Sequence, residues 1–132
     1  MPVLADTSAL YALLDPNDAQ HRAAATWFQG WSADGADPLL THNYVVIEAA
    51  ALIQRRLGTA ATRALFESLL PTMHMLFVDE QLHGQAESAY LAAPAGPSLV
   101  DCTSFQVMRT RGVREAFAFD GHFAEQGFET VP

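Results

Sequence analysis

The fold class is decided by the stretch Val3–Leu10, which reads VLADTSAL. Its apolar start is typical of a buried strand, and we expect that strand over Pro2–Ala5. The residues after it, up to Leu14, have the composition of a short helix. A strand that passes directly into a helix is characteristic of proteins in which helices connect parallel strands. The opening stretch therefore predicts an α/β fold.

The rest of the chain alternates short apolar runs with longer segments of helical periodicity, which indicates a parallel sheet with helices packed on it. Further strands are expected at Leu39–Thr41, Met75–Val78, Ala116–Phe119 and Phe128–Val131. Helices are expected over Asp18–Gln29, Asn43–Arg56 (ended by Gly58), from Thr59 as a cap to just before Pro71, over Glu80–Leu91 and over Ser98–Arg111, with loops at Gly30–Pro38 and Pro94–Pro97. The prediction is one domain over residues 1–132, a three-layer α/β/α domain with a short, mainly parallel sheet of about five strands.

The composition is that of a globular protein and excludes several kinds of chemistry. Half of the 132 residues are hydrophobic and 17% are charged, so disorder is not expected. Fifteen acidic residues face seven basic ones, all of them arginine. The lack of lysine excludes P-loop nucleotide hydrolysis, Schiff-base chemistry and phosphoaspartate sites that use a lysine. A net charge of −8 argues against non-specific coating of nucleic acid, so a nucleic-acid role needs a local site with metal ions.

The cellular compartment is expected to be the cytoplasm. Cys102 is the only cysteine, which excludes an internal disulfide and fits a reducing compartment. No apolar run approaches the ~18 residues of a membrane span, and no charged and then apolar leader opens the sequence. We therefore expect no membrane partner.

Two aspartates follow predicted strands. Asp6 comes directly after the first strand, and Asp120 ends the strand at Ala116–Phe119. In open parallel sheets, ligands bind outside the carboxyl ends of the strands, where both side chains would lie. Each aspartate also has a structural alternative: Asp6 could cap the next helix, and Asp120, which precedes Gly121, could belong to a turn.

Two further acids lie in predicted helices. Glu48 is the only charge in the apolar stretch Tyr44–Ile53, which predicts a buried helix. A buried carboxylate is costly unless it pairs with an arginine or binds a metal ion. Asp101 follows Ser98 by three residues, which is the spacing of a capping box and also places the acid at the start of a helix.

Together, the four acids predict a metal site at one edge of the sheet. Carboxylates so close together would repel one another unless a cation lay between them. One or two Mg²⁺ or Mn²⁺ ions favour oxygen ligands and would remove that repulsion. Such ions promote phosphodiester cleavage by water, so no nucleophilic side chain is needed. The residues by themselves thus indicate metal-dependent phosphoryl chemistry.

The acids lie in motifs that resemble those of the PIN-domain ribonucleases, specifically the VapC-type toxins of toxin–antitoxin pairs. The matching motifs are Leu4–Leu10, Val46–Ala49, Ser98–Cys102, Ala118–Phe123 and Phe128–Val131. Each motif is short, but their order and separations span nearly the whole chain. The resemblance implies a PIN-like fold and a Mg²⁺- or Mn²⁺-dependent endoribonuclease that cleaves RNA with a metal-activated water.

The resemblance also implies roles for individual acids. The catalytic quartet would be Asp6, Glu48, Asp101 and Asp120. Within it Asp6, Asp101 and Asp120 would bind the metal ion, with Asp6 and Asp101 as the principal ligands.

Neighbouring residues and partners follow from the same resemblance. Thr7 and Ser8 match the small hydroxyl residues beside the first acid and would orient a carboxylate or a water molecule. Where some relatives carry a further acid after the fourth, this chain has His122, which puts a complete second metal site in doubt. The family further implies a homodimer and a cognate VapB-type antitoxin that inserts a segment, often with an arginine, into the acidic site.

Several other residues are expected to be structural. None of the five histidines shows paired metal-ligand spacing, so roles in the core or at the surface are expected for His21, His42, His74, His83 and His122. A lone cysteine such as Cys102 is usually a small buried hydrophobe. Trp27, Phe28 and Trp31 follow helical spacing and are expected in the core or a dimer surface rather than under RNA bases. Among the histidines only His122, two residues after Asp120, is a candidate for the site.

Two other functions compete with the ribonuclease. A PIN-like fold could serve only as a binding scaffold, although the presence of all four acids argues against it. An aspartyl-phosphate phosphatase would also place Asp6 after the first strand. In that case Ser8 stands where a second aspartate is usual, and lysine is missing.

Overall fold

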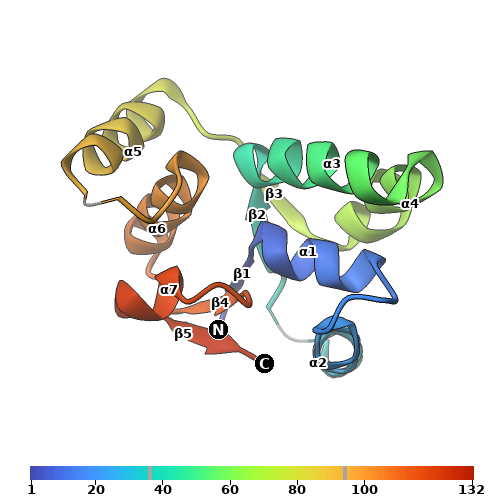
Figure 1. Cartoon of the computed structure of the whole chain (residues 1–132). Coiled ribbons are helices and arrows are strands. Elements are labelled where there is room, and N and C mark those ends of the chain that lie inside the picture. The colour runs from blue at the N-terminus through green and yellow to red at the C-terminus, as the bar shows by residue number, and fades with distance from the viewer. Residues whose placement is uncertain (36, 94) are drawn as a thin grey trace.

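Five short strands and seven helices alternate along the chain in the computed structural model, which describes residues 1–35, 37–93 and 95–132 (Figure 1). The strands are β1 (Val3–Ala5), β2 (Leu39–His42), β3 (His74–Leu76), β4 (Glu115–Phe117) and β5 (Glu129–Val131). The helices are α1 (Thr7–Leu14), α2 (His21–Asp34), α3 (Asn43–Leu57), α4 (Thr59–Ala64), α5 (Glu80–Ala92), α6 (Leu99–Arg111) and α7 (His122–Glu125).

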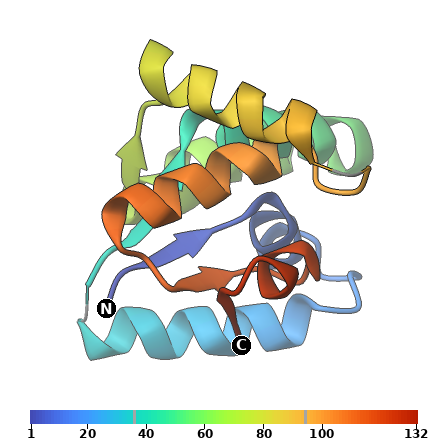
Figure 2. The same ribbon diagram turned by 90° about the vertical axis from the view of Figure 1, so that its left-hand side faces the viewer.

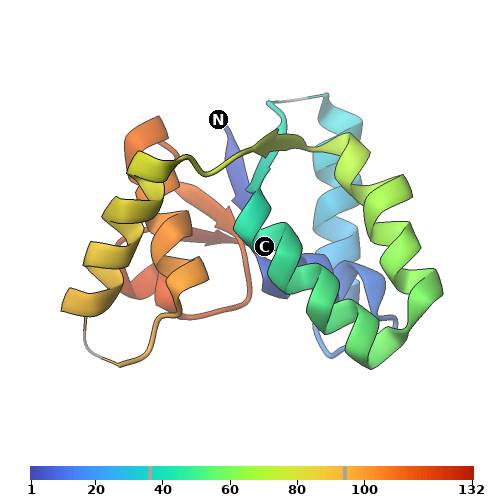
Figure 3. The ribbon, with the colours of Figure 1, turned by 90° about the horizontal axis from the view of Figure 1, so that it is seen from above.

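The strands form one parallel sheet in the order β3-β2-β1-β4-β5, with β1 at its centre. A connection between parallel strands must cross over a face of the sheet, and helices make these crossings. Seen from above, α5 and α6 lie on one side of the sheet and α1 to α4 on the other (Figure 3). The predicted three-layer α/β/α domain with five strands is confirmed, and every strand pair is parallel.

Two hydrophobic clusters, one on each face of the sheet, hold the layers together. Val3 and Ala5 belong to the cluster shared with α1, α2 and α3, whereas Leu4 belongs to the cluster shared with α6. Helix α5 packs on α6 at the outside of that layer (Figure 2). Because β1 is buried on both faces, its sequence is continuously apolar rather than alternating.

Helix α2 extends into the segment predicted as a loop at Gly30–Pro38. It continues through Asp34 and ends at Gly35, whose φ of 60° is left-handed. The rings of Trp27 and Trp31, one helical turn apart in the segment that contains Gly30, stack with centroids 5.2 Å apart. Packing of Trp27 against the core therefore outweighs the poor helix propensity of a single glycine. Both tryptophans are partly buried against the core, which is one of the two placements expected from the sequence.

Other helix boundaries also differ from the prediction. Gly58 ends α3 as predicted, with a φ of 89°, but it is Gly58 and not Thr59 that lies at the cap position of α4. The chain then stays helical past Pro71, as a π-helical turn over Leu65–Leu69 and a 3-10 turn over Leu70–Thr72. Proline is tolerated there because the first turn of a helix leaves its N–H groups unbonded.

The ends of two strands and the presence of one short helix also differ from the prediction. Both β3 and β4 begin one residue earlier and end two residues earlier than predicted. Helix α7 was not predicted. Ala36 and Pro94, which fall in the two predicted loops, lie outside the described residues. None of the helices in the described part of the chain is long and apolar enough to cross a membrane.

Candidate functional site

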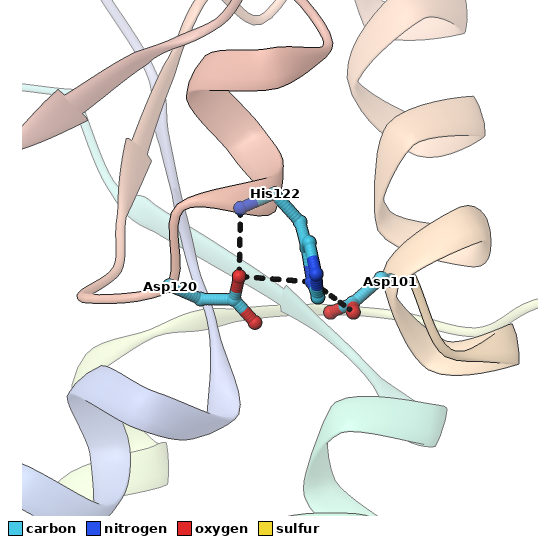
Figure 4. A group of neighbouring side chains, drawn as sticks. All are labelled: Asp101, Asp120 and His122. Atoms are coloured by element: carbon cyan, nitrogen blue, oxygen red, sulfur yellow. Dashed lines mark hydrogen bonds and ion pairs between the residues drawn. The ribbon is translucent and has the colours of Figure 1, made fainter. Parts of the chain in front are cut away.

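The carboxyl ends of the neighbouring strands β1 and β4 bring Asp6 and Asp120 to the same edge of the sheet. Asp6 follows β1 directly, and its backbone N–H donates a hydrogen bond of 3.0 Å to the carbonyl of Phe117 at the end of β4. Asp120 lies three residues beyond Phe117. The first turn of α6, with Asp101, faces this edge (Figure 4).

Asp6 is buried and caps helix α1. Its Oδ2 accepts hydrogen bonds from the Ser8 hydroxyl at 2.7 Å and from the Ser8 backbone N–H at 3.2 Å. The Ser8 Oγ in turn accepts a bond of 3.0 Å from the backbone N–H of Phe119. One hydroxyl thus orients the Asp6 carboxylate and ties it to the segment that leads to Asp120.

The carboxyl group of Asp6 is easily protonated. Burial raises its pKa to about 6, and the negative charge of Asp101 adds to the rise, while the hydrogen bonds from Ser8 oppose it. Near neutral pH the protein therefore holds a buried carboxylate next to a second one. A nearby cation would relieve both the burial cost and the repulsion.

Asp101 is held in a capping box at the start of α6. Its Oδ2 accepts a bond of 3.0 Å from the Ser98 backbone N–H, and the Ser98 hydroxyl accepts one of 3.1 Å from the Asp101 N–H. Asp101 is only 8% exposed. The structural role that the spacing suggested is present, and the same carboxylate also faces the other groups of the site.

His122 lies between the two aspartates on the α7 side. Its Nδ1 is 3.2 Å from Asp101 Oδ2 and 3.0 Å from Asp120 Oδ1 (Figure 4). Asp120 Oδ1 also accepts a bond of 2.7 Å from the His122 backbone N–H, which closes a tight turn. Burial would lower the pKa of His122, but the charges of Asp120 and Asp101 outweigh it and raise that pKa. The sequence hint was the spacing of two residues from Asp120.

The position of Glu48 contradicts the sequence prediction of a buried acid. Helix α3 buries Val45, Ala49 and Ile53, which share one face at helical spacing, whereas Glu48 is exposed. Ile47 beside it is 66% exposed. The apolar composition all round α3 therefore does not make it a buried helix, because its outer face meets solvent. Glu48 is not in the group that Asp101 and Asp120 form.

The hydroxyl residues beside Asp6 differ in their surroundings. Ser8 is bonded to Asp6 and Phe119, as described above. Thr7 is buried, and among the described residues its Oγ1 has no hydrogen-bond partner. A buried hydroxyl without a partner is unusual in proteins, and it is a place where a bound water or ligand is expected.

The donor set fits a divalent cation. One ligand atom from each of Asp101, Asp120 and His122 lies within 4.8 Å of the others. Asp6 lies beside this group, close enough for the charge of Asp101 to raise its pKa. Carboxylate oxygens and an imidazole nitrogen are ligands for divalent metal ions, and the orphaned Thr7 hydroxyl adds a polar atom next to Asp6.

Two residues next to the site are structural. His42 caps α3, accepting from the Val45 N–H, and its Nε2 lies 2.8 Å from Ser104 Oγ on α6. Burial lowers the pKa of His42 to about 4, so its imidazole is neutral at pH 7. Cys102 is buried, which raises the pKa of its thiol and makes it a poor nucleophile. Both confirm the structural roles expected from the sequence.

Comparison with known proteins identifies relatives along the whole chain. A family model described as the PIN domain matches residues 3–129. The 23S rRNA-specific endonuclease VapC20 of Mycobacterium tuberculosis is 35% identical over 131 residues, which are 98% of this chain and 97% of that protein.

Two solved structures have the same fold. The crystal structure of M. tuberculosis VapC20, described as a toxin that cleaves the sarcin-ricin loop, superposes with a TM-score of 0.85 at 33% identity and covers 98% of this chain and 99% of that one. The crystal structure of FitAcB from Neisseria gonorrhoeae superposes with a TM-score of 0.69 at 16% identity, over 100% and 97% of the two chains. At that identity, the second match concerns the fold alone.

Proposed function

Because the chain belongs to the PIN-domain family, we propose that it is a metal-dependent endoribonuclease and the toxin of a toxin–antitoxin pair. The observation that carries the proposal is the meeting of Asp101, Asp120 and His122 beside the buried Asp6, at the carboxyl ends of β1 and β4. Similarity to a 23S rRNA endonuclease, at 35% identity over 98% of the chain, supports the same reaction class.

The metal would be held by Asp101 and Asp120, with Asp6 beside them. The chemistry that a divalent cation supplies when bound there is Lewis acidity toward the phosphodiester and neutralisation of its charge. Mg²⁺ and Mn²⁺ both suit this largely carboxylate donor set. The aspartates repel the anionic RNA backbone by themselves, so substrate binding depends on that neutralisation.

The chain's own groups keep the site in one geometry. The Ser8 hydroxyl fixes the rotation of the Asp6 carboxylate, and the capping box fixes Asp101. The Asp120 carboxylate is fixed by the His122 backbone N–H. Carboxylates that are already oriented need no reorganisation when the reaction begins, which is the main source of electrostatic catalysis. The Thr7 hydroxyl is a candidate for orienting a water molecule or a substrate oxygen.

The substrate that we propose is the sarcin-ricin loop of 23S rRNA, by analogy with VapC20. This loop is a defined local structure, and recognition of RNA by shape at a loop does not require a broadly basic protein. A net charge of −8 is compatible with such a local mode of binding. We further propose a homodimer and a cognate VapB-type antitoxin as the partner that covers the acidic site.

The test is cleavage of purified ribosomes followed by mapping of new RNA 5′ ends. Asp101→Asn keeps an oxygen that can accept from Ser98, so the fold is retained, but it removes a charged ligand and should slow cleavage at least about 100-fold. Asp79→Asn is the matched control, because Asp79 also caps a helix, α5, away from the site. EDTA should abolish cleavage by the unsubstituted protein.

The possible results distinguish whether the protein is a ribonuclease, whether the sarcin-ricin loop is its substrate, and whether it is only a binding scaffold. New ends that require Asp101 but not Asp79 establish the ribonuclease and map its target. Ends outside the sarcin-ricin loop would retain the enzyme and replace the substrate. An Asp101→Asn protein that cleaves at the normal rate would remove Asp101 from the site. No cleavage of any RNA by folded, metal-loaded protein would favour a binding scaffold.

Glu48 remains a proposed member of the acidic set. It lies on α3, whose capping residue His42 contacts α6 through Ser104. Glu48→Gln in the same ribosome assay decides its role. A carboxylate that takes part in the reaction slows cleavage when it is neutralised, whereas an ordinary solvent-exposed acid leaves the rate unchanged.

A further inference from the structure

We infer that His122 is itself a ligand of the metal site, and that its imidazole makes the site select a first-row transition-metal dication over Mg²⁺. The inference rests on the proposed metal-dependent function and adds a ligand and a metal preference to it. Neither the four acids nor the similarity to other PIN domains implies a histidine ligand, because the ligands expected from the family are all carboxylates.

The separations of the three ligand atoms suit a shared cation. His122 Nδ1 lies 3.0 Å from Asp120 Oδ1 and 3.2 Å from Asp101 Oδ2. Two ligands at right angles around a six-coordinate ion with bonds of about 2.1 Å are about 3 Å apart. The nitrogen therefore already stands at the distance from each carboxylate that neighbouring ligands of one ion have.

The Nδ1 atom of His122 faces two carboxylate oxygens with only one hydrogen-bonding position. Nδ1 carries either one hydrogen or one lone pair, so it can form only one well-directed hydrogen bond. It nevertheless faces an oxygen of Asp101 and an oxygen of Asp120 at once (Figure 4). A cation between the three atoms satisfies all of them together.

The ring is oriented by its position in the fold. His122 is the first residue of α7, and its backbone N–H is bonded to Asp120. The next residue, Phe123, is fully buried and anchors α7 to the core. On the other side of the ring, Nε2 lies near Gly96, where it would be 3.8 Å from an added Cβ. Nδ1 is thereby left facing the two carboxylates.

The nitrogen ligand determines the metal preference. Mg²⁺ is a hard ion that prefers oxygen and loses its water ligands reluctantly. Imidazole binds first-row transition ions well, and their affinities for such sites rise from Mn²⁺ through Co²⁺ toward Cu²⁺. Two carboxylates with one imidazole therefore favour Mn²⁺ and its neighbours in this series over Mg²⁺.

The test uses Mn²⁺ as the probe in the full-length, metal-free protein. Electron spin-echo modulation detects a nitrogen nucleus bound to Mn²⁺, and calorimetric titration gives the dissociation constants for Mn²⁺ and Mg²⁺. The variants are His122→Asp, which replaces the nitrogen with oxygen, and His122→Asn, which keeps a neutral side chain. His74→Asn is the control, since His74 is an exposed histidine on β3. Circular dichroism establishes that each variant is folded.

The unsubstituted protein and His74→Asn should show nitrogen modulation, and both His122 variants should lose it. The ratio of the Mg²⁺ to the Mn²⁺ dissociation constant should fall at least about tenfold in His122→Asp, as expected for a change in metal coordination. Mn²⁺ binding without nitrogen modulation in the unsubstituted protein would overturn the inference, as would an unchanged ratio in both His122 variants.

Failure of this inference is distinct from failure of the proposed function. If the protein cleaves RNA but its bound Mn²⁺ shows no nitrogen ligand, the proposed ribonuclease function is retained and His122 is not a metal ligand. A protein that binds neither ion at millimolar concentration would overturn both. Nitrogen modulation in a protein that cleaves no RNA would retain the metal site and reject the nuclease.

Discussion

Asp6 is the residue at which stability and proposed function conflict most directly. Its carboxylate is buried next to Asp101, and the hydrogen bonds from Ser8 and from the Thr7 backbone offset only part of the cost of its charge. Natural proteins often accept such a cost where a charge is needed for binding or chemistry. The cost should be measurable in the metal-free protein.

Asp6→Asn should stabilise the metal-free protein at neutral pH. The unfolded Asp6 has the ordinary pKa of 3.8, and the folded one a pKa of about 6. The folded state therefore binds more protons between these values, so this group's contribution to stability is lost as the pH rises through that window. At pH 7.5 the substitution should increase the free energy of unfolding by about 1–3 kcal/mol.

Urea unfolding at pH 7.5 and at pH 4, in the presence of EDTA, measures this effect. The stabilisation should disappear at pH 4, where Asp6 is protonated in the folded protein. An equal change in the free energy of unfolding at both pH values would show that the buried, ionised Asp6 carboxylate does not destabilise the folded protein. Added Mn²⁺ should reverse the order of stability, because only the protein with Asp6 gains its full set of ligands.

His42 should make the protein sensitive to acid. The unfolded imidazole has a pKa of 6.5, whereas burial lowers that of the folded one to about 4. The unfolded state binds more protons between these values, so stability is present above pH 6.5 and is lost as the pH falls toward 4. The loss attributable to His42 should be about 3 kcal/mol over that window.

His42→Asn tests this, because asparagine can still cap α3 by accepting from Val45 but does not titrate. The variant will be less stable at pH 7, since the bond to Ser104 is lost. Its deficit relative to the unsubstituted protein should shrink by about 3 kcal/mol on going from pH 7 to pH 4. A deficit that stays constant with pH would contradict the neutral, buried imidazole.

At the scale of elements, α2 shows how packing can override propensity. Gly30 lies within the helix, and a Cβ added there meets no atom within 4 Å. Gly35 ends the same helix with a φ of 60°, a conformation that residues with a side chain rarely adopt. The backbone of α2 therefore accepts a side chain at Gly30 but disfavours one at Gly35.

Gly30→Ala should raise the free energy of unfolding by about 0.5–1 kcal/mol, because alanine has the higher helix propensity and restricts the unfolded chain. Gly35→Ala is the matched substitution and should destabilise the protein, since the backbone there is left-handed. Thermal and urea unfolding of both variants measure the difference. Destabilisation by Gly30→Ala would indicate that α2 does not continue through this position.

Two other elements bring the site residues into contact. The capping box starts α6 at Ser98 and makes Asp101 a structural residue as well as a proposed ligand. The turn at Asp120 starts α7 and places His122 opposite α6. For Asp101 and Asp120 alike, the hydrogen bond that starts the helix or closes the turn also orients the carboxylate.

At the scale of the whole molecule, the site is assembled from three distant parts of the chain. Asp6 follows β1, Asp101 begins α6, and Asp120 with His122 follows β4. Parallel pairing of β1 with β4 brings the first and last parts together. The contact of α6 with the sheet brings the middle part to the same edge.

The acidic surface limits how RNA can approach. Arg109 donates a hydrogen bond to Gln126 and lies over the rings of Phe105 and Phe128. Arg56 lies over the Tyr11 ring. These arginines pack on the protein, so the proposed reaction depends on the cation at the acidic site more than on a basic track.

The sequence by itself determined the α/β class, the number of strands and the positions of Asp6, Asp101 and Asp120 at the end of a strand or the start of a helix. These features depend on local patterns: apolar runs, helical periodicity and acids that follow strands or begin a helix. The family resemblance rested on the same short motifs. Such patterns can be recognised in the sequence because residues close together in the chain belong to the same helix or strand.

Only the tertiary structure decided the environment of Glu48, the length of α2 and the position of His122. Glu48 is exposed because nothing in the described residues covers that face of α3, which no local pattern reveals. Helix α2 continues because Trp27 packs on Phe117, a residue far away in the sequence. His122 meets Asp101 across two elements. Contacts between residues distant in sequence depend on the arrangement of the whole sheet, and that arrangement is a property of the fold.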